Sequence, residues 1–173
     1  NETLDQITAN DWDYVILQDQ SQTPAVFPDR FTAGLSDLDE LIDELGAQTV
    51  LFMTWGYRDG DVKYNPDRYP SYRPMQDDLS RAYKNGAEKA DAILDPVGEA
   101  WRIVHKEHEE LWKELYRKDG SHPSPKGAYL AANVFYWILF DEDPAALNFT
   151  FNLDEEECRI LQDAAKRSAA KVK

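Results

Sequence analysis

Residues 12–18 are Trp12-Asp13-Tyr14-Val15-Ile16-Leu17-Gln18, a run of β-branched and aromatic side chains that a polar loop follows. A short, continuously apolar run of this kind is typical of a strand buried on both faces of a sheet. Residues 48–54 and 92–95 have the same character, and the last run stops at Pro96, which has no N–H to donate to a neighbouring strand. The sequence therefore predicts three buried strands.

Helical patterns follow these runs. Ser36 stands at an N-cap position before an apolar stripe that ends at Gly46, which predicts a helix over residues 36–45. Ser124 and Pro125 fit the cap and the first turn of another helix. We expect the other helices over residues 75–89, 98–117, 125–140 and 154–170. Strands that alternate with helices favour an α/β fold, a parallel sheet with helices on both faces.

The length of the chain suits one hydrophobic core, so we expect a single domain over residues 1–173. Three strands make a narrow sheet for five helices. We therefore expect one or two further strands to come from residues before Asn1 or from another chain. On this interpretation the chain is the C-terminal portion of its domain.

The chain is strongly acidic, with 33 acidic and 19 basic side chains and a formal net charge of −14. Its field repels phosphate backbones and anionic lipids, so we expect neither nucleic acid nor a membrane as a partner. No run of about 18 apolar residues that could span a bilayer is present, and we expect a soluble protein. The single cysteine, Cys158, cannot form an internal disulfide.

Asp119 and His122 are the best candidates for catalytic residues. They are three residues apart around Gly120, a spacing that lets the carboxylate reach back to the imidazole and fix its tautomer. A histidine held in this way can take a proton from a serine hydroxyl and return it to a leaving alcohol. The alternative is an Asp-Gly turn with an exposed histidine near the start of a helix.

The segment Asp119-Gly120-Ser121-His122-Pro123, followed by a helix, resembles the last sequence block of the SGNH (GDSL-like) hydrolase superfamily. Leu17-Gln18-Asp19-Gln20-Ser21 stands where that superfamily has a Gly-x-Asn-Asp block, and is similar to a poorly characterised branch. Thr54-Trp55-Gly56 and Asp95-Pro96-Val97-Gly98 also look like segments that this branch has after its later strands. The resemblance covers most of the chain from Trp12 to Phe140.

The resemblance implies a three-layer, flavodoxin-like α/β fold and a serine esterase or acyl hydrolase that uses no metal or other cofactor. In that case His122 is the base, Asp119 orients it, and Gln20 donates a hydrogen bond to the oxyanion. A carboxamide suits this last task because its NH₂ group stabilises developing negative charge. Gln20 has one methylene more than the asparagine of the family and is alternatively a plain turn residue. The resemblance also favours a secreted or periplasmic location.

The nucleophile block of the family, a Gly-Asp/Asn-Ser segment after the first strand, is absent from residues 1–173. No serine of the chain stands in a Gly-x-Ser context after an apolar strand, the arrangement that exposes a nucleophile. We therefore expect the serine to come from an N-terminal segment or from a second chain. We also expect the 173 residues alone not to hydrolyse esters.

Loops that follow parallel strands collect reactive side chains, and this rule selects Gln18, Trp55, Tyr57 and Arg58 as substrate-binding residues. Tyrosine and arginine recur from residue 57 to residue 73, and such side chains suit stacking on sugar rings or pairing with carboxylates. We expect a small-molecule or carbohydrate ester as substrate, such as an O-acetyl group on a sugar. An ordinary packed surface loop explains the composition equally well.

Two other interpretations remain open. The same fold could serve as a non-catalytic module that binds a glycan or a protein, which the missing serine favours. His105 and His108 could in principle hold a metal, but with Trp101 and Trp112 they form one stripe of a predicted helix. That stripe is more typical of packing, so we expect no metal site.

Overall fold

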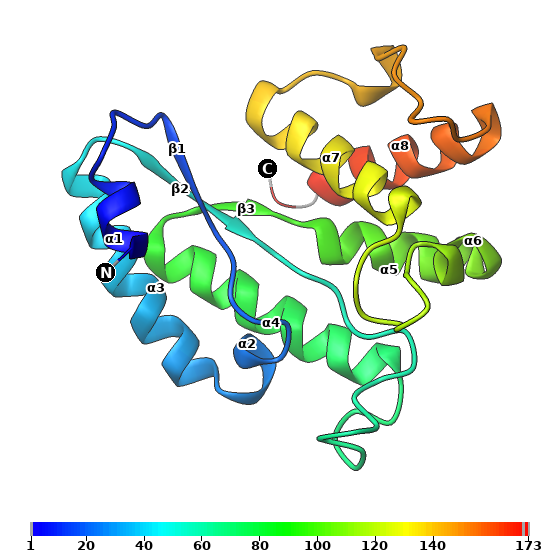
Figure 1. Ribbon diagram of the computed structural model, residues 1–173, viewed down its shortest axis with the longest axis horizontal. Coiled ribbons are helices and arrows are strands. Elements are labelled where there is room, and N and C mark those ends of the chain that lie inside the picture. The colour runs from blue at the N-terminus through cyan, green and yellow to red at the C-terminus, as the bar shows by residue number, and fades with distance from the viewer. Residues whose placement is uncertain (1, 171, 173) are drawn as a thin grey trace.

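The computed structural model describes residues 2–170 and residue 172, and a parallel sheet of three strands lies at its centre. β1 (Tyr14–Leu17), β2 (Gln48–Phe52) and β3 (Ile93–Asp95) lie in that order, with β2 in the middle. Helices cover both faces of the sheet (Figure 1). The predicted α/β fold with a flavodoxin-like arrangement of layers is therefore confirmed.

Each face of the sheet has its own helices. One face carries α2 (Thr23–Val26), α3 (Pro28–Glu44) and α4 (Tyr72–Ala90), and the other carries α5 (Val97–Glu107), α6 (Glu109–Glu114), α7 (Pro125–Phe140) and α8 (Glu155–Ala169) (Figure 1). α1 (Glu2–Ile7) precedes β1, and a 3-10 turn, η1 (Pro144–Ala146), follows α7. Leu51 of β2 packs into the core beneath α3 and α4, whereas Phe52 packs toward α5 and α7. Two cores therefore share one sheet.

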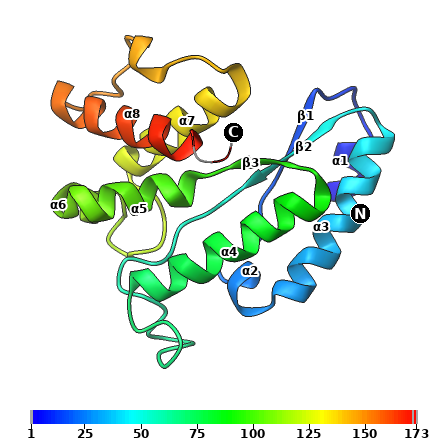
Figure 2. The same cartoon turned by 180° about the vertical axis from the view of Figure 1, so that it is seen from behind.

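β1 is an edge strand, and Figure 2 shows it at the outer side of the sheet. Tyr14 is 40% exposed and Ile16 is 48% exposed. The prediction that this strand is buried on both faces is therefore wrong for the described residues. β1 lies at the edge of the sheet, where β2 is its one neighbouring strand among residues 2–170 and 172, so it is less enclosed than β2.

Two predicted helix boundaries are also wrong. Ser36 lies inside α3, which begins at Pro28, because Phe31 and Leu35 extend the buried stripe toward the N-terminus. The helix expected over residues 98–117 is two helices, divided at His108. Residues seven apart on a continuous helix are separated by about 10 Å along its axis. The ring centroids of His105 and Trp112 are only 4.3 Å apart, which requires this break.

The local signals for the last helices are confirmed. The Ser124 hydroxyl accepts a hydrogen bond from the Gly127 amide at the start of α7, and Pro125 occupies the first turn. The Asp154 carboxylate accepts one from the Glu157 amide and begins α8. Among the helices of residues 2–170, none combines the length and the apolar character that crossing a bilayer requires.

Candidate active site

The loop between α6 and α7 holds the predicted catalytic pair. Tyr116 and Pro123 form an antiparallel bridge at its base, and the Arg117 amide donates to the His122 carbonyl over 2.8 Å. The Gly120 amide donates to the Arg117 carbonyl over 3.0 Å, and Gly120 has a φ of 69°, a conformation that suits glycine. The loop is therefore a closed turn with a defined backbone.

Asp119 and His122 interact as their spacing predicts. Oδ2 of Asp119 lies 3.0 Å from Nδ1 of His122, and Oδ1 accepts hydrogen bonds from the amides of Ser121 and His122, each over 2.9 Å. These two amides, and then the His122 ring, lower the pKa of Asp119 to about 2. The carboxylate is therefore ionised at neutral pH and accepts the Nδ1 proton. In a neutral ring with that tautomer, Nε2 carries the lone pair that a general base needs.

A cavity of about 510 Å³ lies beside His122. Its walls come from the carboxyl ends of β1 and β2, from one face of α7 and from the loop between α6 and α7. We call this loop the catalytic loop because it holds the predicted catalytic pair. The lining residues are Gln18, Ser21, Phe52, Thr54, Trp55, Ser121, His122, Pro123, Ala128, Ala131, Ala132 and Phe135. The His122 side chain is 71% exposed and that of Asp119 is 49% exposed. The pair therefore stands at an open flank of the molecule.

The structure brings together some of the predicted site residues and separates others. Gln18 and Trp55 line the cavity with His122, whereas Gln20 does not. Oε1 of Gln20 accepts a hydrogen bond from the Gln22 amide over 3.1 Å, in the turn after β1. Within the described residues, Gln20 is thus part of a turn next to the cavity.

Tyr57 and Arg58 lie behind the cavity rather than on its wall. The Tyr57 hydroxyl accepts a hydrogen bond from Nε2 of Gln22 over 3.4 Å. The guanidinium of Arg58 pairs with Asp59, and the Arg58 amide donates to the Gly120 carbonyl over 2.8 Å. Both residues therefore contact the segments that carry the site, the turn after β1 and the catalytic loop.

Sequence reasoning missed two features of the cavity. Ser21 lines it, and its place in the loop that follows β1, where ligands of parallel sheets bind, is the signal that could have found it. The second feature is the apolar wall of α7, which includes Ala131 and Phe135. Phe135 does contact Phe52 of β2, with ring centroids 4.9 Å apart, but Ala131 and Ala132 face the cavity.

Comparisons with known proteins found two solved structures with a similar fold. No family profile and no curated protein matches the chain. A crystal structure of a DUF4886 family protein from Bacteroides uniformis superposes with a TM-score of 0.83 at 19% identity, over 99% of this chain and 71% of that one. A protein from Slackia heliotrinireducens, described as "a putative SGNH hydrolase", superposes with a TM-score of 0.69 at 30% identity, over 80% of this chain and 71% of that one. The chain belongs to the SGNH hydrolase superfamily.

Two tyrosines at the end of the long loop after β2 and at the start of α4 have a structural role in this SGNH domain. Tyr69 and Tyr72 are 0% and 3% exposed and belong to the two cores. Arg68 pairs with Asp78 of α4 and donates to the Ala25 carbonyl of α2. Tyr69 therefore anchors a loop whose residues 62–71 are otherwise mostly exposed.

The histidine stripe is also structural in this SGNH domain. The ring of His105 lies against Tyr72 and Trp112, with centroid distances of 4.8 and 4.3 Å. Its burial, and then the charge of Arg73, lower its pKa. Within residues 2–170 and 172, no three His, Cys, Asp or Glu side chains are grouped so that they could hold a metal ion.

Proposed function

We propose that the chain is the base-carrying part of a serine esterase or acyl hydrolase, whose nucleophilic serine comes from an N-terminal segment or a second chain. The observation that supports this proposal is the contact between Asp119 and His122 beside an open cavity at the carboxyl ends of β1 and β2. Ligands of parallel α/β sheets bind at this edge of the sheet. An ionised carboxylate that orients an imidazole toward such a cavity is the arrangement a general base requires.

In the proposed reaction, Nε2 of His122 takes the proton of the serine hydroxyl while the serine oxygen bonds to the carbonyl carbon of the ester. The carbonyl π electrons move to its oxygen. When the intermediate collapses, the bond to the leaving alcohol breaks, and Nε2 gives that alcohol its proton. Water repeats the sequence, which releases the acid and restores the serine. Asp119 keeps its charge throughout and stabilises the protonated ring.

The free edge of β1 suggests where the serine enters. A strand that pairs in parallel with β1 would cover Tyr14 and Ile16, the exposed apolar side chains of that strand. Its carboxyl end would then lie near Gln18, which lines the same cavity as His122. A serine directly after such a strand would meet the base from the open flank, where the His122 ring is exposed.

Gln20 is the proposed oxyanion donor, and Gln18 and Trp55 are proposed to contact the substrate. The Gln20 side chain is exposed next to the cavity, with its oxygen engaged by Gln22, so its NH₂ group is the part left to donate. Removal of one such donor typically slows an acyl transfer by about 100-fold or more. The substrate class we favour is a carbohydrate ester, because a wall that holds the Trp55 indole and the Gln18 carboxamide suits a sugar ring.

Fluorophosphonate labelling tests this function. A longer product that includes the upstream segment is expected to be labelled on one serine, and a His122→Ala variant on none. The 173-residue chain alone is expected to stay unlabelled, with Ser21→Ala as the control for the hydroxyl that lines the cavity. A folded longer product without any label would favour a non-catalytic glycan- or protein-binding module. Label on Ser21 of the chain alone would place the nucleophile within it.

A further inference from the structure

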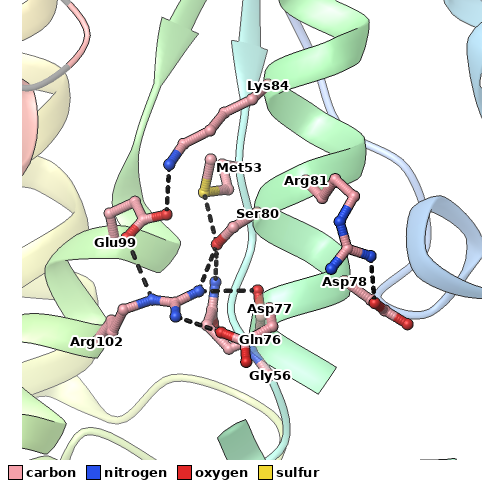
Figure 3. A network of polar contacts seen from close by, with 10 residues as sticks. All are labelled: Met53, Gly56, Gln76, Asp77, Asp78, Ser80, Arg81, Lys84, Glu99 and Arg102. Atoms are coloured by element: carbon pink, nitrogen blue, oxygen red, sulfur yellow. Dashed lines mark hydrogen bonds and ion pairs between the residues drawn. The ribbon is translucent and has the colours of Figure 1, made fainter. Parts of the chain in front are cut away.

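Gln76, on α4, lies at the centre of a buried polar network behind the catalytic loop (Figure 3). Its side chain is 0% exposed. Oε1 accepts a hydrogen bond from the Gly56 amide over 2.8 Å, and Nε2 donates to the Ser80 hydroxyl oxygen over 3.2 Å. A buried carboxamide with both ends bonded stabilises one arrangement of the groups it joins.

The orientation of the Gln76 amide is fixed by its neighbours. Nη2 of Arg102 donates to the same Ser80 oxygen over 2.9 Å, and Arg102 pairs with Glu99 and Asp77 (Figure 3). Lys84 also pairs with Glu99, over 3.0 Å. Because this cluster joins α4 to α5, Oε1 of Gln76 is held toward the segment that follows β2.

Gly56 is held from both sides. Its amide donates to Gln76, and its carbonyl accepts a hydrogen bond from the Tyr116 hydroxyl over 2.8 Å. A Cβ at this position would lie 3.1 Å from the Tyr72 carbonyl oxygen, which leaves little space for a side chain. The backbone next to Trp55 is therefore fixed by one residue of α4 and by one residue at the base of the catalytic loop.

Trp55 connects this backbone segment to the catalytic loop. Its indole stacks on Trp101, with centroids 4.1 Å apart and planes 7° from parallel, and Trp101 is 0% exposed. Nε1 of Trp55 donates to the Ser121 carbonyl oxygen over 3.0 Å. That carbonyl belongs to the peptide group whose N–H, on His122, donates to Asp119 over 2.9 Å. The peptide group before His122 is thus held on one side by Trp55 and on the other by Asp119.

We infer that Trp55 is a positioning residue for His122, and that Gln76 sets the place of Trp55 through Gly56. This inference rests on the proposed function, because it gives the base its supporting contacts. Trp55 also lines the cavity, so one side chain forms part of the substrate wall and fixes the peptide group that carries the base.

Titration of the Asp119 carboxyl by ¹³C NMR tests the inference on the 173-residue chain. Trp55→Phe keeps an aromatic ring and removes only the indole N–H. We expect the pKa of Asp119 to rise from about 2 toward the ordinary value of 3.8, since the turn whose amides solvate this carboxylate loses its outer contact. Trp137→Phe, on the far part of α7, is the matched control and should leave the titration unchanged. An unchanged titration in Trp55→Phe would overturn the inference.

Two further variants test the step through Gly56. Gln76→Met and Tyr116→Phe each remove one of the hydrogen bonds that hold Gly56, and both should shift the Asp119 titration in the same direction but less than Trp55→Phe. Tyr116→Phe keeps its ring in the core, so this variant still tests the role of Gly56 if the Gln76→Met variant does not fold. Titrations identical to that of the unmodified chain would exclude the role of Gly56. A failure of fluorophosphonate labelling would overturn the esterase proposal and leave these titrations as they are.

Discussion

β1 and β2 have similar apolar sequences and different surroundings. Residues 12–18 and 48–54 both predict strands buried on two faces, and β2 fulfils this with Val50 at 0% and Leu51 at 1% exposure. In β1, Ile16 is 48% exposed. The difference is that β1 lies at the edge of the sheet, and it supports the proposal that a further strand pairs there. The proposed catalytic pair, Asp119 and His122, lies beside the cavity at the carboxyl ends of both strands.

The largest expected effect is on the pH dependence of stability, and it comes from Asp95 of β3. Asp95 of β3 pairs in register with Phe52 and is 0% exposed. Burial raises its pKa to about 8, so the folded chain keeps a proton that the unfolded chain loses near pH 3.8. This contribution to stability is complete below pH 3.8 and is lost as the pH rises to about 8, by up to about 1.4 kcal/mol per pH unit.

Asp95→Asn should remove this dependence and make the chain more stable than the unmodified protein at pH 8. Urea unfolding at pH 5, 6.5 and 8 measures the effect. Asp13→Asn, at an exposed position just before β1, is the matched control and should keep the slope. Parallel stability profiles for the unmodified chain and Asp95→Asn would contradict the burial of an unpaired carboxyl at the end of β3.

The second effect compares one side chain from each strand. Leu51→Ala removes a fully buried side chain from β2 and should lower the free energy of unfolding by about 3 kcal/mol. Ile16→Ala, in β1, should cost less than about 1 kcal/mol, because the side chain already contacts solvent. Chemical denaturation of the two variants measures the difference. Equal costs would mean that β1 is covered in the folded chain.

Much of this arrangement follows from local sequence signals, and the rest depends on contacts between distant residues. Ser124, Pro125 and Gly46 mark helix ends in the sequence because capping and positive φ act within one turn. The early start of α3 depends on Phe31 packing against Tyr83, whose ring centroid is 5.1 Å away. Such packing leaves no local signal.

Within the site, too, local contacts could be predicted and contacts between distant residues could not. The contact between Asp119 and His122 could be predicted because two residues three positions apart in one turn make it. The hydrogen bond from Trp55 to Ser121 joins residues 66 positions apart. The place of Gln20 beside the cavity is set by a turn whose geometry follows from the Gln22 amide. The contact between Trp55 and Ser121 could not be predicted without the fold.

The smallest expected effect concerns Asp119 at low pH. Its pKa is about 2 in the folded chain, against 3.8 as the ordinary value, because two amides and the His122 ring bind the carboxylate. Its contribution to stability is therefore present above pH 3.8 and is lost as the pH falls through about 2. As the pH falls from 4 to 2, the Asp119→Asn variant should therefore lose less stability than the unmodified chain. Thermal unfolding over this pH range measures the difference. A steeper loss in the variant would contradict the hydrogen bonds of the turn.

The most direct test of the central claim is an experimental structure of the fluorophosphonate-labelled protein with its nucleophile segment present. The account predicts that this segment pairs in parallel with β1, covers Ile16, and places the modified serine oxygen within hydrogen-bond distance, about 3 Å, of Nε2 of His122. A segment that binds elsewhere on the sheet, or a His122 ring turned away from both Asp119 and the serine, would contradict it.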